Sequence, residues 1–255
     1  MEAMTWPEIR QALQAGKTTA VLAVASTEQH GPALPLNTDE EIGRALAVEV
    51  ALALGDALVA PVVAPGCSDH HLAWPGTVSI PPDLLAAVVS HHLRNLAGHG
   101  FREIVLFSSH GGNFGPLGSR LQQLRAAAGS ARLIDLLDPD WFFDAWFTVL
   151  RAHGRQEVTL PHADVMETAM MMYLRPDLVR QDKLEPGFTG TVLLDELTAR
   201  GLSAFTSNGV LGDPRGATAE LGRALLEGIA RAMVREIRRR RGQIPAASPE
   251  GRPVA

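Results

Sequence analysis

Short apolar runs alternate with longer amphipathic stretches along most of the chain. Four runs of six or seven residues, rich in Val, Leu, Ile and Ala, have the length and composition of buried strands: 19–25, 57–63, 103–108 and 131–136. Apolar residues at helical spacing predict helices over 39–54, 82–96, 113–128, 164–174 and 218–240. Strands that alternate with helices are typical of βαβ units, so the pattern predicts an α/β fold with a mainly parallel sheet.

Composition narrows the class of protein. Of the 255 residues, 46% are hydrophobic and 20% are charged, which is typical of a globular protein and not of a disordered one. The net charge of −5 argues against nucleic-acid binding, and no apolar run reaches the roughly 18 residues of a membrane helix. We therefore expect neither nucleic acid nor a membrane as a partner. We predict one domain over 1–242 and a disordered tail over 243–255, which is rich in Pro, Ala and Gly.

The single cysteine suits a reducing compartment. Cys67 cannot form an intramolecular disulfide bond, and the first residues lack the basic and apolar segments of a signal peptide. These features favour a cytoplasmic location. No base is placed to activate Cys67, so we expect an inert, buried thiol.

Ionisable side chains gather where the predicted strands end. In parallel sheets, ligands bind at the carboxyl ends of the strands. The loops that follow the first three runs contain the residues Glu28, His30, Asp39, Asp69, His70, His71 and His110. A further cluster, His162 and Glu167, opens a predicted helix. We expect these groups to face one cleft.

Imidazoles and carboxylates without a thiolate cluster suit zinc, manganese or iron(II). Glu28 and His30 are two residues apart, so both can point the same way from an extended segment. Asp39 has two carboxylate oxygens and can bridge two ions. A structural interpretation also exists for single residues, because Asp39 can act only as a helix N-cap and His110 can be a satisfied polar residue at a strand end.

Other conspicuous residues have simpler interpretations. The histidines outside the loops are expected at the surface or at an interface: His91, His92, His99 and His153. Met170, Met171 and Met172 are expected in the core. The aromatic residues between 141 and 147 favour a core position or a contact between subunits, with docking of a partner protein as the alternative.

Five segments resemble the creatininase family of metal-dependent amidohydrolases. They are STEQHGPALPLNTD (26–39), the stretch 68–80 with the sequence WPGTVSI, SHGGN (109–113), HADVMET (162–168) and GVLGDPRGATAELG (209–222), and they occur in the family's order. The resemblance implies a three-layer α-β-α sandwich, a dinuclear metal centre of two divalent ions per chain, and a homo-oligomer, with a hexamer as one form.

The resemblance also implies roles for individual residues. Glu28, His30, Asp39 and His110 match metal ligands, with Asp39 as the bridging ligand. Creatininase has a further carboxylate ligand at the position of Gly112, and we assign its role here to Glu167. The remaining assignments are His162 as the catalytic residue that handles protons and, for substrate binding, Ser68, His71, Gly111 and Gly112.

The hypothesis from the sequence is metal-assisted hydrolysis of a C–N amide bond in a small molecule, such as a cyclic amide or a formamide. A water that bridges the two ions attacks the carbonyl carbon. One ion and the N–H groups of Gly111 and Gly112 stabilise the oxyanion, and His162 passes a proton to the leaving nitrogen. The alternatives are a peptidase of the mycofactocin type, a hydrolase of a cyclic ketone, and a metal-binding or scaffold protein without turnover. The substrate, the native metal and the oligomer number stay open.

Overall fold

A parallel sheet of four strands forms the centre of the molecule. The computed structural model describes residues 1–155 and 160–243, so the predicted tail lies outside the described residues apart from Gln243. The strand order is β2-β1-β3-β4. The strands are β1 (Thr19–Val24), β2 (Ala57–Val59), β3 (Glu103–Ser108) and β4 (Arg132–Leu136). All six residues of β1 are buried, as expected for an inner strand that is apolar throughout.

The register brings the carboxyl ends of the strands to one edge of the sheet. Thr19 lies opposite both Ala57 and Glu103, and Glu103 lies opposite Arg132. The strands therefore start level and run in the same direction. Because β1 and β3 have equal lengths and pair along all six residues, the loops that follow them leave the sheet side by side. This edge carries the ionisable loops.

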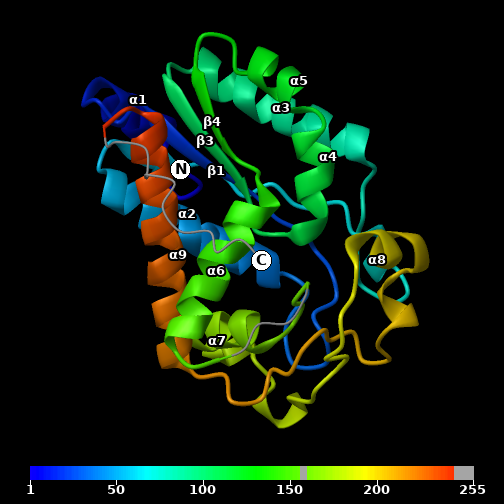
Figure 1. Cartoon of the computed structure of the whole chain (residues 1–255). Helices are drawn as coiled ribbons and strands as arrows, with labels where there is room; N and C mark the ends of the chain where they lie inside the picture. The colour runs from blue at the N-terminus through cyan, green and yellow to red at the C-terminus, as the bar shows by residue number, and fades with distance from the viewer. Residues whose placement is uncertain (156–159, 244–255) are drawn as a thin grey trace, which may run out of the picture.

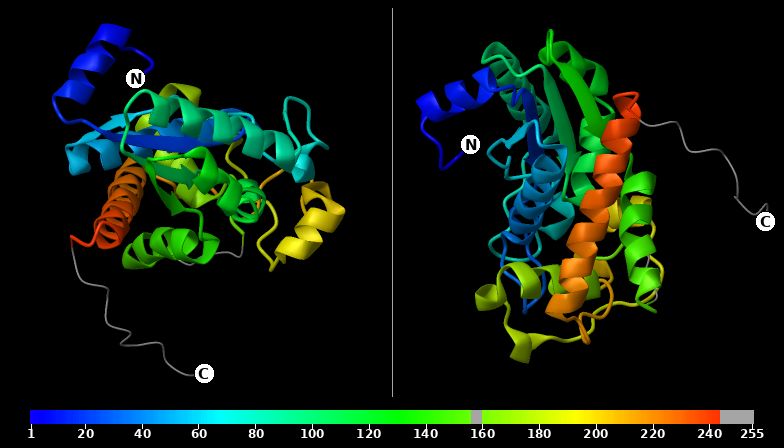
Figure 2. Two further views of the ribbon diagram at one scale, coloured as in Figure 1. Left: turned by 90° about the horizontal axis from the view of Figure 1, so that it is seen from above. Right: turned by 90° about the vertical axis from the view of Figure 1, so that its left-hand side faces the viewer.

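Helices cover both faces of the sheet (Figures 1 and 2). One face is covered by α3 (Pro82–Gly98), α4 (Phe114–Gly118) and α5 (Leu121–Ala127). The other is covered by α2 (Thr38–Leu54) and α9 (Ala219–Arg240), and α6 (Pro139–Ala152) and α7 (Val165–Leu174) pack against α9. The view from above shows α3 and α9 on opposite sides of the strands (Figure 2). The predicted three-layer α-β-α arrangement is confirmed.

Close packing of α9 fixes the position of α7. The side chain of Thr218 accepts a hydrogen bond from the Leu221 N–H and caps the start of α9. A Cβ at Gly222 would lie 1.9 Å from the carbonyl oxygen of Ala169, so only glycine permits this approach of the two helices. The first turn of α7, which carries Glu167, and the segment just before it, which carries His162, are therefore held in place by α9.

Two predicted elements differ in detail. The second strand ends at Val59, ahead of Pro61, and lies at the edge of the sheet because proline cannot donate a ladder hydrogen bond. The helix predicted over 113–128 is broken into α4 and α5, since Gly115, Pro116 and Gly118 disfavour a continuous helix. Three helices were not predicted as elements: α1 (Trp6–Gln14), α6 and α8 (Leu194–Arg200). Within the described ranges, no helix is long and apolar enough to span a bilayer.

Candidate metal centre and substrate cavity

Four buried side chains meet at the carboxyl edge of the sheet. Glu28 and His30 come from the loop after β1, Asp39 from the first turn of α2, and His110 from the end of β3. Each is at most 4% exposed. Glu167, in the first turn of α7, reaches the same place, with its Oε2 near His30. The structure thus brings together all five residues that the sequence analysis assigned as ligands.

Asp39 lies between two groups of ligand atoms. Its Oδ1 lies 3.4 Å from His30 Nε2, and its Oδ2 lies 3.4 Å from His110 Nδ1. Glu28 Oε1 is 3.2 Å from His110 Nδ1, and Glu167 Oε2 is 3.7 Å from His30 Nε2. One group is therefore Glu28, Asp39 and His110. The other has His30 between Asp39 Oδ1 and Glu167 Oε2, and His162 offers a further ligand atom beside His30 and Glu167. A carboxylate with one oxygen in each group has the geometry of a bridging ligand.

The unpartnered atoms of this cluster fit a metal centre. Glu28 Oε2, His30 Nε2 and Asp39 Oδ2 are buried without a hydrogen-bond partner. Buried polar atoms are normally paired, so three such atoms in one cluster indicate a missing cationic partner. The far nitrogens are occupied: His30 Nδ1 is 3.1 Å from the Glu28 carbonyl oxygen, and His110 Nε2 is 3.0 Å from that of Cys67. When each histidine donates its N–H to a carbonyl oxygen in this way, its other ring nitrogen is free to bind a metal ion.

Without an ion, protons take the place of the cation. Burial disfavours a charged His30, but the carboxylates of Asp39 and Glu167 outweigh burial and raise its pKa to about 10. Burial likewise opposes the charge on His110, yet Glu28 and Asp39 raise the pKa of this imidazole well above its usual value. Burial raises the pKa of the Glu167 carboxyl to about 8, although the charge of His30 acts in the opposite direction.

Gly112 leaves no room for a side chain beside His110. A Cβ at this position would lie 2.4 Å from both the Cys67 carbonyl oxygen and His110 Nε2. No carboxylate side chain fits there with the present backbone. The orientation of the Glu167 side chain is instead fixed by the Ala163 N–H, which donates to Glu167 Oε2 at 2.6 Å. Ala163 has a left-handed backbone conformation, with φ 51°. Asp164 caps the start of α7 with its carboxylate, and burial raises the pKa of this group to about 7.

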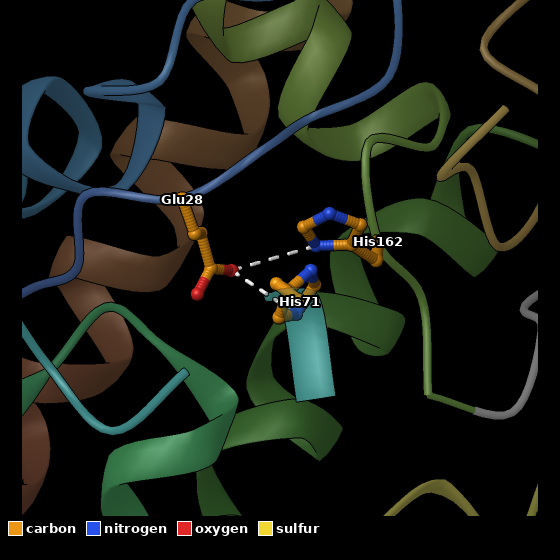
Figure 3. Close-up of side chains that lie close together, drawn as sticks. All are labelled: Glu28, His71 and His162. Carbon is orange, nitrogen blue, oxygen red and sulfur yellow. Dashed lines mark ion pairs between the residues drawn. The ribbon is translucent and has the colours of Figure 1, made fainter. Parts of the chain in front are cut away.

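Two further histidines face Glu28 (Figure 3). Glu28 Oε1 lies 3.4 Å from His71 Nε2 and 3.8 Å from His162 Nδ1. Burial lowers the pKa of both imidazoles, that of His162 to about 3, to which the charge on His30 contributes. Both side chains therefore stand neutral beside the cluster. Their ligand atoms also lie within 4.8 Å of Glu28, which raises the question whether they form a further metal site.

Gln29, which the sequence analysis missed, answers this question for His71. Its Oε1 accepts from the Gly31 N–H at 2.9 Å, so its amide nitrogen must point the other way. The amide nitrogen lies 3.0 Å from the Gly209 carbonyl oxygen, 2.9 Å from His71 Nδ1 and 3.0 Å from His162 Nε2. Because His162 Nε2 itself donates to a carbonyl oxygen, the two amide hydrogens go to Gly209 and to His71 Nδ1. His71 is therefore protonated at Nε2, the atom that faces Glu28 Oε1 at 3.4 Å.

The same assignment of donors and acceptors determines the tautomer of His162. Its Nε2 lies 2.8 Å from the Gln29 carbonyl oxygen and donates to it, because a carbonyl only accepts. The bare Nδ1 then faces the site. Gly209 makes this arrangement possible, because a Cβ there would lie 2.0 Å from Gln29 Oε1. Gln29 stands between two predicted ligands in the sequence, but its partners are 42, 133 and 180 residues away, so no local signal identifies its role.

A cavity of about 620 Å³ opens onto the cluster. Its lining includes His71, Gly111, Gly112 and His162, as the substrate-binding and proton-transfer assignments require. Ser68 is absent from the lining among the described residues. It is fully buried behind His110, with its Oγ 3.2 Å from His110 Nε2 and 2.5 Å from Ser26 Oγ.

His70, which the sequence analysis placed in the loop but gave no role, also lines the cavity. Its ring stacks on His110 at a centroid distance of 5.8 Å. Burial lowers its pKa to about 4, and the neighbouring charge of His110 acts in the same direction.

Residues with simpler interpretations lie at the surface, in the core or at the cavity wall. His91, His99 and His153 are exposed and His92 is half-buried, as predicted. Met170 and Met171 are fully buried in the core and Met172 is half-buried. On α6, Phe142 and Trp146 are buried in the core and Phe143 is half-buried, and all three also line the cavity. Cys67 is half-buried, and burial raises the pKa of its thiol, as expected for an unreactive cysteine.

Comparisons with known proteins show which proteins this chain resembles. The family model described as creatinine amidohydrolase matches residues 2–237. The mycofactocin precursor peptide peptidase of Mycobacterium tuberculosis (strain H37Rv) is 33% identical over 230 residues, which cover 86% of this chain and 84% of that protein. The creatinine amidohydrolase of Pseudomonas putida is 31% identical over 192 residues, which cover 71% of this chain and 74% of that protein.

Solved structures agree in fold. A mutant creatininase of the Zn–Zn type superposes with a TM-score of 0.79 at 25% identity and covers 94% of this chain and 97% of its own. A creatininase with Mn has a TM-score of 0.74 at 28% identity, with the same coverage. Fold and relatives together define a hydrolase that acts on C–N bonds. The chain belongs to the creatininase family.

Proposed function

We propose that this protein is a dinuclear metal-dependent amidohydrolase. The observation that carries the proposal is the group of three buried, unpartnered ligand atoms around Asp39. Glu28, Asp39 and His110 would hold one ion, and His30, Asp39 and Glu167 the other. When bound, two divalent ions supply Lewis acidity that lowers the pKa of a water and polarises a carbonyl. The Zn–Zn and Mn forms of the related creatininases support zinc or manganese, and iron(II) is compatible with the same ligands.

The protein's own groups then handle the proton and the substrate. The bare Nδ1 of His162 faces Glu28 and can accept a proton from the nucleophilic water and give it to the leaving nitrogen. His71, whose protonated Nε2 faces Glu28, keeps this carboxylate oriented. The turn at Gly111 and Gly112 lines the cavity, where backbone N–H groups can stabilise an oxyanion. Ser68 we assign to the orientation of His110, because it does not reach the cavity wall.

A second candidate is a peptidase of the mycofactocin type. It is favoured by the relatives with 33% identity and 84% coverage of their own chain, and by a cavity with room for more than a small ring. The chemistry is the same in both cases, because a peptide bond is an amide. The two candidates differ only in the group that the cavity accepts.

Metal analysis followed by a substrate panel tests the proposal. Protein purified without chelator should contain about two transition-metal ions per chain, and zinc, manganese and iron(II) should each be offered to the metal-free form. The loaded protein is then assayed on creatinine, on formamides and on short peptides. Turnover of any of these selects the branch of the family. A protein that binds no ion after reconstitution contradicts the proposed ligand set.

Assembly and location are proposed on the family resemblance and the composition. We propose a homo-oligomer, with a hexamer as the form to test, formed by one domain over 1–242 and working in the cytoplasm. Light scattering of the purified protein measures the oligomer number directly. Fractionation of the source cells measures the location.

A further inference from the structure

The cavity continues from the polar cluster to an apolar wall formed by two helices. From α6 it is lined by Phe143 and Trp146, and from α8 by Leu194, Leu197 and Thr198. Pockets lined in this way bind apolar groups, with a few polar groups to fix the orientation. We call this part the apolar chamber.

The α8 side of the chamber is a built wall and not a loose loop. Leu197 packs with Val192, Leu202 and Leu211 in a small cluster that is separate from the main core. The helix also contacts the short 3-10 turn η1 (Asp69–His71), which carries His71. The wall is therefore tied to the proposed site by direct packing.

The charge of the lining selects against anions. Among the described residues that line the cavity there is no Lys or Arg, and residues 156–159 contain neither. Three carboxyl groups remain beyond the proposed ligands: Asp69, Asp140 and Asp164. A substrate carboxylate in the chamber would be partly desolvated without a side-chain cation to pair with, and it would be repelled by Asp69 and Asp140.

We infer that the amide substrate carries a bulky apolar group, held between α6 and α8, and no carboxylate at that end. The inference rests on the proposed function, because it takes the ions as the anchor of the reacting amide. It names the substrate class by chemistry: a neutral or cationic amide with an aromatic or branched aliphatic substituent. It holds for a small molecule and for a peptide tail.

Hydroxamates provide the probe, because they chelate divalent ions and carry any chosen tail. The metal-loaded protein is titrated by calorimetry with acetohydroxamate, with 4-phenylbutanohydroxamate and with the monohydroxamate of adipic acid, which ends in a carboxylate. The phenyl tail should bind at least about tenfold more tightly than acetohydroxamate, from the apolar area it buries. The carboxylate tail should bind no more tightly than acetohydroxamate.

Two neighbouring leucines give a matched pair of variants. Leu193 and Leu194 are 58% and 59% exposed, and Leu194 lines the cavity whereas Leu193 does not. Leu194→Lys should weaken the phenyl compound severalfold and strengthen the carboxylate compound. Leu193→Lys should change neither, although it places the same charge one residue away.

The possible results distinguish a failure of the apolar chamber from a failure of the proposed metal centre. Equal affinity of all three hydroxamates overturns the chamber and leaves the metal proposal standing. Equal effects of the two lysine variants also overturn the chamber. Failure of every hydroxamate to bind the metal-treated protein overturns the proposed function and the chamber with it.

Discussion

The two ends of the central sheet contain the same kinds of residue in opposite states. At the amino end, Arg241 donates to Glu103 Oε1 at 2.7 Å and to Thr19 Oγ1 at 2.9 Å, and it lies 3.2 Å from Asp56. At the carboxyl end, Glu28 Oε2 and Asp39 Oδ2 are buried without a hydrogen-bond partner. None of the unpartnered buried atoms among the described residues belongs to the amino-end group.

The difference shows where fold stability and chemistry are separated. An ion pair in which both charged side chains belong to the chain stabilises the fold, and it leaves no unpaired charge to bind a ligand. A buried acidic cluster without its cation costs stability and persists because something outside the chain completes it. A concentration of charged residues therefore does not by itself indicate a metal site. Buried charged atoms without a hydrogen-bond partner do.

Exchange of one aspartate at each end gives the largest contrast. Asp39→Ala should remove both ions and lower kcat/KM at least about 1,000-fold, because one carboxylate serves both metal positions. Asp56→Ala should leave metal content and activity unchanged and lower the free energy of unfolding by about 1 kcal/mol. Elemental analysis and denaturant unfolding measure both. Two bound ions and normal turnover in Asp39→Ala would contradict the bridging role.

Removal of the proposed proton carrier should separate metal binding from turnover. His162→Ala should retain about two ions per chain, while kcat falls about 100- to 10,000-fold. His153→Ala is the control, because this exposed histidine donates to the Val149 carbonyl oxygen of α6 and does not line the cavity among the described residues. Loss of an ion from His162→Ala would make this residue a ligand instead.

The metal affinity of the carboxyl end should depend steeply on pH. In the metal-free protein the pKa of His30 is raised to about 10, so this ligand is protonated at neutral pH and an ion must displace the proton. Affinity should therefore rise from pH 6 to pH 8, by about tenfold per pH unit for each proton displaced. Competition with a chelator of known affinity measures the slope. An affinity that does not change with pH would contradict the protonated state.

The smallest expected effect concerns the tautomers that Gln29 sets. Gln29→Glu removes the donor to His71 Nδ1, so this imidazole should become protonated there, and kcat should fall about tenfold. Nitrogen-15 chemical shifts of the His71 ring report the change directly. Thr77→Val is the control, because it removes only the hydrogen bond to the Gln29 backbone N–H. Identical ring spectra in both variants would show that Gln29 is merely structural.

Local sequence patterns predicted most of the architecture. The apolar runs of β1 and β3 and the periodic helices α2, α3, α7 and α9 lie where the pattern indicated, since burial of a strand or of one helix face requires that period. The capping box of Thr5 and Glu8 is a local sequence signal for the start of α1. The break between α4 and α5 and the short β2 follow from proline and glycine, whose local effects outweighed the apolar pattern.

The sequence by itself determined the chemical type of the site: imidazoles and carboxylates at strand ends, in a chain of the creatininase family. Only the tertiary structure decided how these groups are used. It placed Ser68 behind His110, set the tautomers of His71 and His162 through Gln29, and closed an apolar chamber between helices far apart in the chain. The physical reason is that hydrogen-bond direction and cavity shape depend on atoms from distant segments, and no spacing along the chain records where those atoms meet.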